Sequence, residues 1–66
     1  MSEESKPIYL VGKRDEKGTF WCWGEYNNEN KAKASYELTC IDYPDQHIEL
    51  IKEVKVHETL QTHLPL

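Results

Sequence analysis

Residues 20–26, FWCWGEY, decide the fold, because they hold the only Phe and both Trp residues of the 66-residue chain. In a β-strand, successive side chains point to opposite faces. As a strand, this stretch directs Phe20, Cys22 and Tyr26 to one face. Trp21 and Trp23 point to the other. Both faces are then apolar, and so short a chain is expected to leave one of them as a contact surface.

Length and charge limit the functions that the sequence supports. We expect one small domain spanning residues 1–66, without a large enclosed substrate cavity. Twelve acidic residues against eight basic ones give a formal net charge of −4, which disfavours contact with nucleic-acid phosphates. No apolar run approaches the roughly 20 residues needed to span a bilayer, and the N-terminus lacks the pattern of a signal peptide. The sequence therefore predicts a soluble, cytoplasmic protein without a membrane partner.

The two cysteines, Cys22 and Cys40, are predicted to be reduced thiols that pack as small hydrophobic side chains. A disulfide or a metal site is the alternative. His47, His57 and His63 lie at spacings that match no metal-binding template, and no catalytic triad, Cys-His pair or phosphate-cradling glycine loop is discernible. The sequence therefore predicts no catalytic residue, no metal and no cofactor, and hence a protein that is not an enzyme.

A hairpin is predicted at the start of the chain. Residues 8–13 form a short apolar run rich in β-forming residues, and Pro7 precedes it at a position where a strand tolerates a missing N–H. Asp15 and Gly18 then supply the residues that a tight turn needs. The run at residues 8–13 should pair antiparallel with residues 20–26.

Residues 31–43 fit two patterns. As a helix, they have Asn28 as the N-cap and Pro44 as the stop. The helix would carry two apolar stripes, one of Ala32, Tyr36, Cys40 and Tyr43 and the other of Ala34, Leu38 and Ile41. As a strand, they alternate polar and apolar side chains over only part of their length, and the chain would be an all-β meander. We favour the helix, because its capping signals bracket about three to four turns.

The last strand is predicted at residues 47–57. Ile48 and Leu50 share its inner face, and Glu49 is expected to face solvent. Lys52 interrupts the apolar pattern, which indicates a bulge or an exposed strand end.

Together these elements predict an α+β fold of order β-β-α-β. Its sheet has three antiparallel strands with residues 8–13 in the centre, and the helix packs on one face. Residues 1–6 and 59–66 are expected to be flexible tails.

A single helix covers only one face of the sheet. If it covers the face that carries Phe20, then Trp21 and Trp23 lie on the open face, joined by Tyr9 and Val11 from the neighbouring strand. These four are the predicted binding residues, because contiguous apolar patches on small proteins mark interaction sites. The reverse assignment, with the Trp face inward, exposes more aliphatic surface and is the alternative.

Three segments carry a resemblance to known proteins. Residues 18–21, GTFW, enter the second strand, residues 28–43 form a charged helix around Tyr36, and residues 44–54, PDQHIELIKEV, form the turn into the last strand. In this pattern the chain resembles the small β-β-α-β accessory proteins that bacteriophages and mobile elements encode, over about residues 8–58. The resemblance implies a non-enzymatic protein that binds and inhibits or redirects a host protein, and it assigns no site residue.

We therefore expect a protein-binding module, of the type that inhibits or modulates a host protein complex, with aromatic side chains as anchors. Its partner is a host complex or a second copy of the chain. One alternative is a single-stranded nucleic-acid binder that stacks bases on the same Trp pair. The other is a small structural homodimer. Salt dependence separates the first two, because phosphate binding weakens steeply as salt rises.

Overall fold

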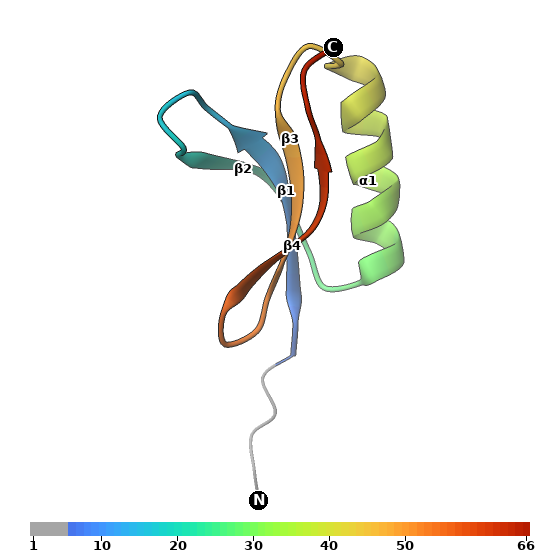
Figure 1. The fold of residues 1–66 in the computed structure, drawn as a ribbon. Coiled ribbons are helices and arrows are strands. Elements are labelled where there is room, and N and C mark those ends of the chain that lie inside the picture. Colours follow the sequence, from blue (N-terminus) through green and yellow to red (C-terminus); the bar gives the residue numbers. More distant parts are fainter. Residues whose placement is uncertain (1–5) are drawn as a thin grey trace, which may run out of the picture.

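The computed structural model describes residues 6–66, which form one helix and one four-stranded sheet (Figure 1). In chain order the elements are β1 (Ile8–Arg14), β2 (Phe20–Tyr26), α1 (Glu29–Asp42), β3 (Ile48–Glu53) and β4 (His57–His63). All pairings are antiparallel, in the order β2-β1-β3-β4. The predicted α+β class and the place of β1 between β2 and β3 are confirmed. The predicted N-terminal tail falls, for residues 1–5, outside the described residues.

The predicted number of strands is wrong, because residues 47–57 do not form one strand. β3 ends at Glu53, and the pairing of Glu53 with His57 closes a tight loop over residues 54–56. β4 then runs back along β3 to His63, so residues 59–63 belong to the sheet and not to a flexible tail. Leu60 packs against the core, and this burial fixes β4 to the rest of the molecule.

The helix α1 forms where the capping pattern predicts it. The side chain of Asn28 accepts a hydrogen bond from the backbone N–H of Lys31 at 3.0 Å, and satisfies one of the free donors of the first turn. Glu29 and Lys33 form an ion pair one turn apart, at 3.1 Å. Ala32 and Tyr36 are buried on the inner stripe.

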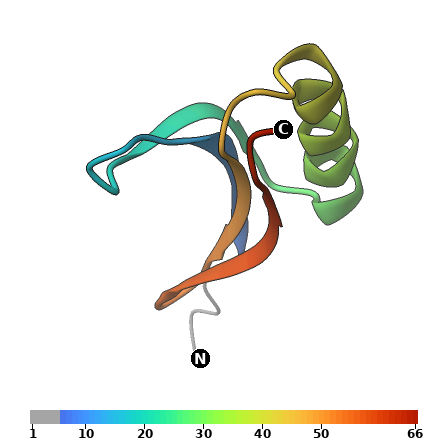
Figure 2. The ribbon, with the colours of Figure 1, turned by 45° about the horizontal axis from the view of Figure 1, so that its top comes forward.

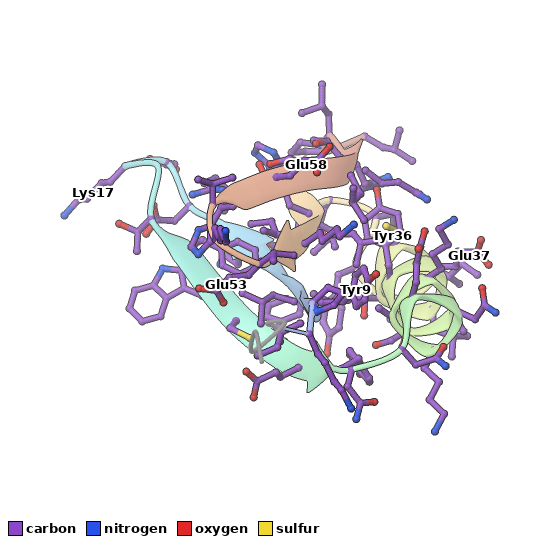
Figure 3. All side chains as sticks on the ribbon, turned by 90° about the horizontal axis from the view of Figure 1, so that it is seen from below. Tyr9, Lys17, Tyr36, Glu37, Glu53 and Glu58 are labelled. Atoms are coloured by element: carbon purple, nitrogen blue, oxygen red, sulfur yellow. The ribbon has the colours of Figure 1, made fainter. Side chains whose placement is uncertain are left out.

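The core lies between α1 and one face of the sheet. Figure 3 shows Tyr9 and Tyr36 between the strands and the helix. The buried members of this cluster are Tyr9, Val11, Ala32, Tyr36, Ile48 and Leu50. The prediction that Tyr9 and Val11 lie on the open face is therefore wrong. They share the face of Leu50, which pairs with Val11 across β1 and β3, and the helix covers that face.

A β-bulge in β2 changes which residues share a face. Val11 pairs with Gly24, but Gly12 pairs with Cys22, so Trp23 is the extra residue on β2. In a classic bulge the extra residue and the next one lie on the same side. Phe20 and Cys22 therefore face away from the helix, as the reverse assignment had it, whereas Trp21, Trp23 and Tyr26 lie on the helix side. The predicted grouping of Tyr26 with Phe20 is wrong for this reason.

The sheet is strongly bent, and its two hairpin ends turn away from the helix (Figure 2). We call the side without the helix the open face. The bend shields the middle of this face, where Ile51 is 3% exposed and Glu49 is 7% exposed. The prediction that Glu49 faces solvent is wrong, because Glu49 lies inside this concave side next to Arg14.

Glycine at position 12 is required by a close approach. A Cβ at Gly12 would collide with the carbonyl oxygen of Trp21 and would lie 2.8 Å from the ring of Phe20. The guanidinium of Arg14 lies 5.2 Å from the centre of the same ring, a distance suited to a cation–π contact. The ring of Phe20 thus covers Gly12 on the open face and joins β2 to β1.

Candidate interaction surface

Three large aromatic side chains are exposed on β2 and at the end of α1. Trp21, Trp23 and Tyr43 are 56%, 48% and 49% exposed. The rings of Trp23 and Tyr43 meet edge to face with their centres 5.3 Å apart, a geometry that aromatic pairs prefer. We call these three residues the aromatic surface. They lie at the outer strand of the sheet and at the end of the helix, where the helix no longer covers the strand.

The turn between β1 and β2 fixes Trp21. The indole N–H of Trp21 donates to a carboxylate oxygen of Asp15 at 2.9 Å. The other oxygen accepts from the backbone N–H groups of Lys17 and Thr19 at 2.9 and 2.8 Å. The indole hydrogen bond, followed by those from the backbone, lowers the pKa of Asp15. Trp21 is therefore exposed but oriented by the turn, which reduces the conformational entropy lost on binding.

Tyr43 is positioned by the end of α1. Its backbone N–H donates to the carbonyl oxygen of Thr39 at 2.8 Å, and Pro44 prevents continuation of the helix. On the strand side, the ring of Tyr26 folds over Gly24, so that a Cβ there would lie 2.7 Å from the Tyr26 hydroxyl. The bulge and this glycine direct Trp23 toward Tyr43.

One flank of α1 faces β2 and adds a negative charge. Ser35, Thr39 and Asp42 recur at helical spacing on this flank. The hydroxyl of Tyr26 in β2 donates to Oγ of Ser35 at 2.7 Å, which orients the flank toward β2. Asp42 is exposed at its end, next to Tyr43.

The surroundings of the aromatic surface are acidic. Asp15 binds Trp21, and the exposed Asp42 directly precedes Tyr43 in the chain. Glu25 is also exposed on β2, but it points to the open face, where it pairs with Leu10. The neighbouring cation is Lys13, which pairs with Trp21 across the strands. Lys17 projects at the far tip of the hairpin (Figure 3). Two carboxylates on the side of the rings, and a third on the open face of β2, thus accompany one neighbouring ammonium group.

A second apolar feature is the outward side of α1. Leu38 and Ile41 are 62% and 72% exposed, and their spacing places them on one stripe. This stripe lies opposite the buried Ala32 and Tyr36. It carries no aromatic ring and borders no strand edge, so the aromatic surface is the stronger candidate for an interface.

A charge cluster of Arg14, His47 and Glu49 lies on the open face. Arg14 donates to Glu49 at 2.6 Å. His47 Nε2 lies 2.9 Å from the other carboxylate oxygen, but it has no aligned hydrogen-bond partner. The bond from Arg14 lowers the pKa of Glu49 despite its burial. Because Arg14 belongs to β1 and Glu49 to β3, the cluster joins the two inner strands.

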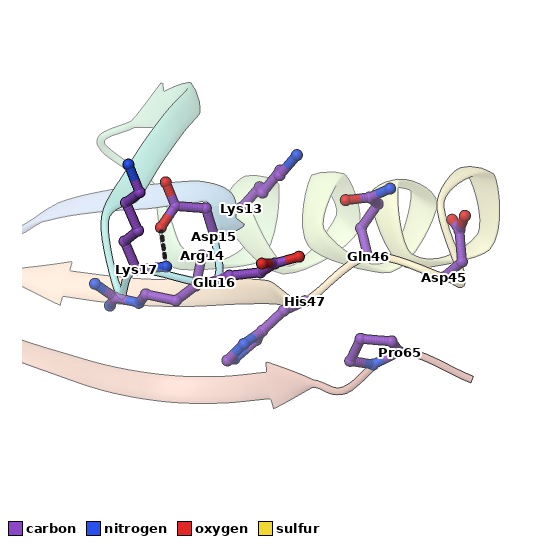
Figure 4. A pocket seen from close by; sticks show the side chains of 9 residues that line it. All are labelled: Lys13, Arg14, Asp15, Glu16, Lys17, Asp45, Gln46, His47 and Pro65. Atoms are coloured by element: carbon purple, nitrogen blue, oxygen red, sulfur yellow. Dashed lines mark hydrogen bonds between the residues drawn. The ribbon is translucent and has the colours of Figure 1, made fainter.

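An open hollow of about 670 Å³ lies between the β1–β2 turn and the loop before β3 (Figure 4). Its charged lining has both signs, with Lys13, Arg14 and Lys17 against Asp15, Glu16 and Asp45. Arg14 is engaged by Glu49 and by the carbonyl oxygen of Gly18. Asp15 is engaged by the turn and by Trp21. The charges of the lining balance in number, and Arg14 and Asp15 are already engaged by other groups, so the hollow offers no site selective for an anion or a cation.

Both cysteines are free thiols. Cys22 is exposed on the open face, and Cys40 packs against the core on the other side of the sheet. Partial shielding from water raises the pKa of both thiols, which opposes nucleophilic reactivity. Among residues 6–66, no three His, Cys, Asp or Glu side chains are arranged to hold a metal ion. No helix in the same range is long and apolar enough to cross a membrane.

Of the four predicted binding residues, only Trp21 and Trp23 are exposed at the surface. Tyr9 and Val11 are 6% and 1% exposed and lie in the core. Sequence reasoning missed Tyr43, which was assigned to an apolar helix stripe. Its position directly before Pro44 is the signal that would have placed it at the helix end, outside the buried stripe.

Comparison with known proteins adds no relative from which a function could be transferred. The chain matches no protein-family model, no curated protein and no solved structure. The aromatic surface is therefore interpreted from its own geometry and charge.

Proposed function

We propose that this chain is a non-enzymatic protein-binding module whose anchor is the aromatic surface. The observation that carries the proposal is the joint exposure of Trp21, Trp23 and Tyr43. Trp and Tyr are enriched among residues that dominate interface energies. Asp15 also holds Trp21 through a hydrogen bond, and Tyr43 holds Trp23 through ring contact. The anchor is therefore preorganised.

A protein partner fits this surface better than a nucleic acid. Sheet-borne aromatics that stack bases are normally accompanied by basic residues that contact phosphates. β2 contains no Lys or Arg, and the chain has a net charge of −4. Carboxylates beside the rings would repel a phosphate backbone. By the same rules they attract a cationic protein surface.

The resemblance to phage-type accessory proteins extends this proposal to the mode of action. Such a module would inhibit or modulate a host complex by occupying a surface that the complex uses. A module that acts through contact at the aromatic surface affects a complex by covering a site that the complex needs. Occlusion is therefore the mode that we propose.

Affinity capture with matched variants tests the proposal. The immobilised wild-type chain is exposed to a lysate of its native host, and captured proteins are identified by mass spectrometry. The double change Trp21→Ala with Trp23→Ala should remove the specifically captured proteins. Ile41→Ala, which truncates a side chain that is 72% exposed on the helix, should retain them.

The comparison between the two variants decides the outcome. If the double variant, shown to be folded by circular dichroism, captures the same proteins as the wild type, the aromatic surface is not the anchor. If only Ile41→Ala loses the captured proteins, the interface lies on the outward side of α1.

A further inference from the structure

We infer that the partner contributes an extended segment of alternating apolar and cationic residues, which adds to the free edge of β2 as a further strand. This inference rests on the proposed function and specifies the chemistry of the partner. Three features carry it: the unpaired edge of β2, the alternation of its side chains, and the acidic surroundings.

The first feature is the edge itself. Within the described residues β2 pairs only with β1, so one side of its backbone has no strand partner. Such an edge presents free N–H and C=O groups that pair readily with an extended chain. Proteins commonly protect edges with charged side chains or proline. β2 has one charged residue, Glu25, and no proline.

The second feature is the alternation of side chains along β2. Trp21 and Trp23 stand on the helix side, whereas Cys22 and Glu25 point to the open face, where Glu25 pairs with Leu10. An added strand places its own side chains alternately beside these two rows. We call the added segment of the partner the guest strand, or guest. One row of its side chains contacts the indole rings, and the other row contacts the Cys22 thiol and the Glu25 carboxylate.

The third feature is charge. Asp15, Glu25 and Asp42 favour Lys or Arg in the guest, since opposite charges steer association and fix register. A second copy of this chain is a poorer occupant, because it would bring another net charge of −4 and its own three carboxylates to the same edge. Indole rings also accept cationic side chains on their faces.

The bulge at Trp23 sets the length of the pairing. Because the bulge interrupts the regular ladder, the added strand pairs in two short runs, with residues 20–22 and with residues 24–26. Trp23 lies between these runs and packs on the guest. The backbone amides on both sides of Trp23 should therefore be protected together.

A displayed library of random peptides, each about ten residues long so that it can span a strand, tests this inference. Selection on the full chain should enrich sequences in which Lys or Arg alternate with Val, Ile, Leu or aromatic residues. The most enriched peptide, made synthetically, should slow amide hydrogen exchange in β2 but not in β4. Glu25→Lys should weaken its binding by about tenfold, whereas Glu58→Lys on the opposite edge should leave it unchanged.

The outcomes separate this inference from the proposed function. Enriched peptides without cationic alternation, or binding without protection of β2, would overturn strand addition, and so would the absence of any enrichment. If binding to such peptides still falls with Trp21→Ala and Trp23→Ala, the aromatic surface remains the anchor. If the free chain forms oligomers as its concentration rises, and Trp21→Ala with Trp23→Ala abolishes them, the occupant of the edge is a second copy of the chain. That result would overturn the inference.

Discussion

The two edges of the sheet differ in what they expose. β2 reads FWCWGEY and β4 reads HETLQTH, at the same length of seven residues. Each strand contains a bulge relative to its neighbour. β2 nevertheless presents two Trp side chains at about half exposure, whereas the outward side chains of β4 are polar or charged.

We propose from this difference that the two edges have different roles. Leu60, the partly buried apolar residue of β4, packs against the core. The C-terminal end of β4 is tied down as well, since the His63 imidazole bonds the carbonyl oxygen of Pro44 at 2.9 Å and the Leu66 N–H bonds the same oxygen at 3.0 Å. β4 closes the fold. Exposed Trp rings on β2 stabilise the fold less, which is consistent with a role in contact with another molecule.

The largest expected effect is on the attachment of β2 to β1. In Gly12→Ala the new methyl group would collide with the Trp21 carbonyl oxygen and the Phe20 ring, so the free energy of unfolding should fall by about 3 kcal/mol or more. Urea denaturation of the variant and the wild type measures this difference in the free energy of unfolding. Gly18→Ala in the same hairpin is the control, because nothing lies within 4 Å of its added carbon. Gly18→Ala should lower the free energy of unfolding by only about 1 kcal/mol, a loss caused by the positive φ of Gly18, 87°, which alanine adopts less readily.

A smaller contrast compares the two edges directly. Leu60→Ala removes a side chain that contacts the core from β4 and should lower the free energy of unfolding by about 2 kcal/mol. Trp23→Ala removes a larger side chain from β2, but one that is 48% exposed, and should cost about 1 kcal/mol. A greater loss for Trp23→Ala than for Leu60→Ala would mean that Trp23 is a structural residue.

The smallest effect concerns the inner strands and pH. The bond from Arg14 lowers the folded-state pKa of Glu49 below the usual 4.5. This pair therefore stabilises the fold above about pH 4.5 and loses its effect as pH falls through the lower folded-state pKa. Glu49→Gln should lower stability by about 1 kcal/mol at neutral pH, and its curve should converge with that of the wild type at pH values below the folded-state pKa of Glu49. Parallel curves at all pH values would exclude Glu49 as a source of the pH dependence.

Local signals in the sequence predicted the elements that have local causes. The helix follows from Asn28 and Pro44, and the first hairpin follows from Asp15 and Gly18. The helical pattern offered two apolar stripes, and the structure buries the one that contains Ala32 and Tyr36. These features depend on neighbours within a few residues, so one sequence contains the information.

The missed features depend on pairing between strands. The β3–β4 loop at residues 54–56, VKV, has no Gly, Pro or Asn, and its β-branched residues are typical of a strand. Gly24 inside a strand was the available sign of a bulge, and using it would have moved Tyr26 to the helix side. The burial of Tyr9 and Val11 follows from their register with β3, which parity within one hairpin does not determine.

The account depends most directly on the accessibility of the two indoles, the only two in the chain. Acrylamide quenching of tryptophan fluorescence measures it in the free monomer and again after a captured partner or selected peptide is added. We predict efficient quenching of both indoles in the free monomer and strong shielding in the complex. Two shielded indoles in a confirmed monomer, or quenching that the bound partner leaves unchanged, would contradict a binding surface on β2.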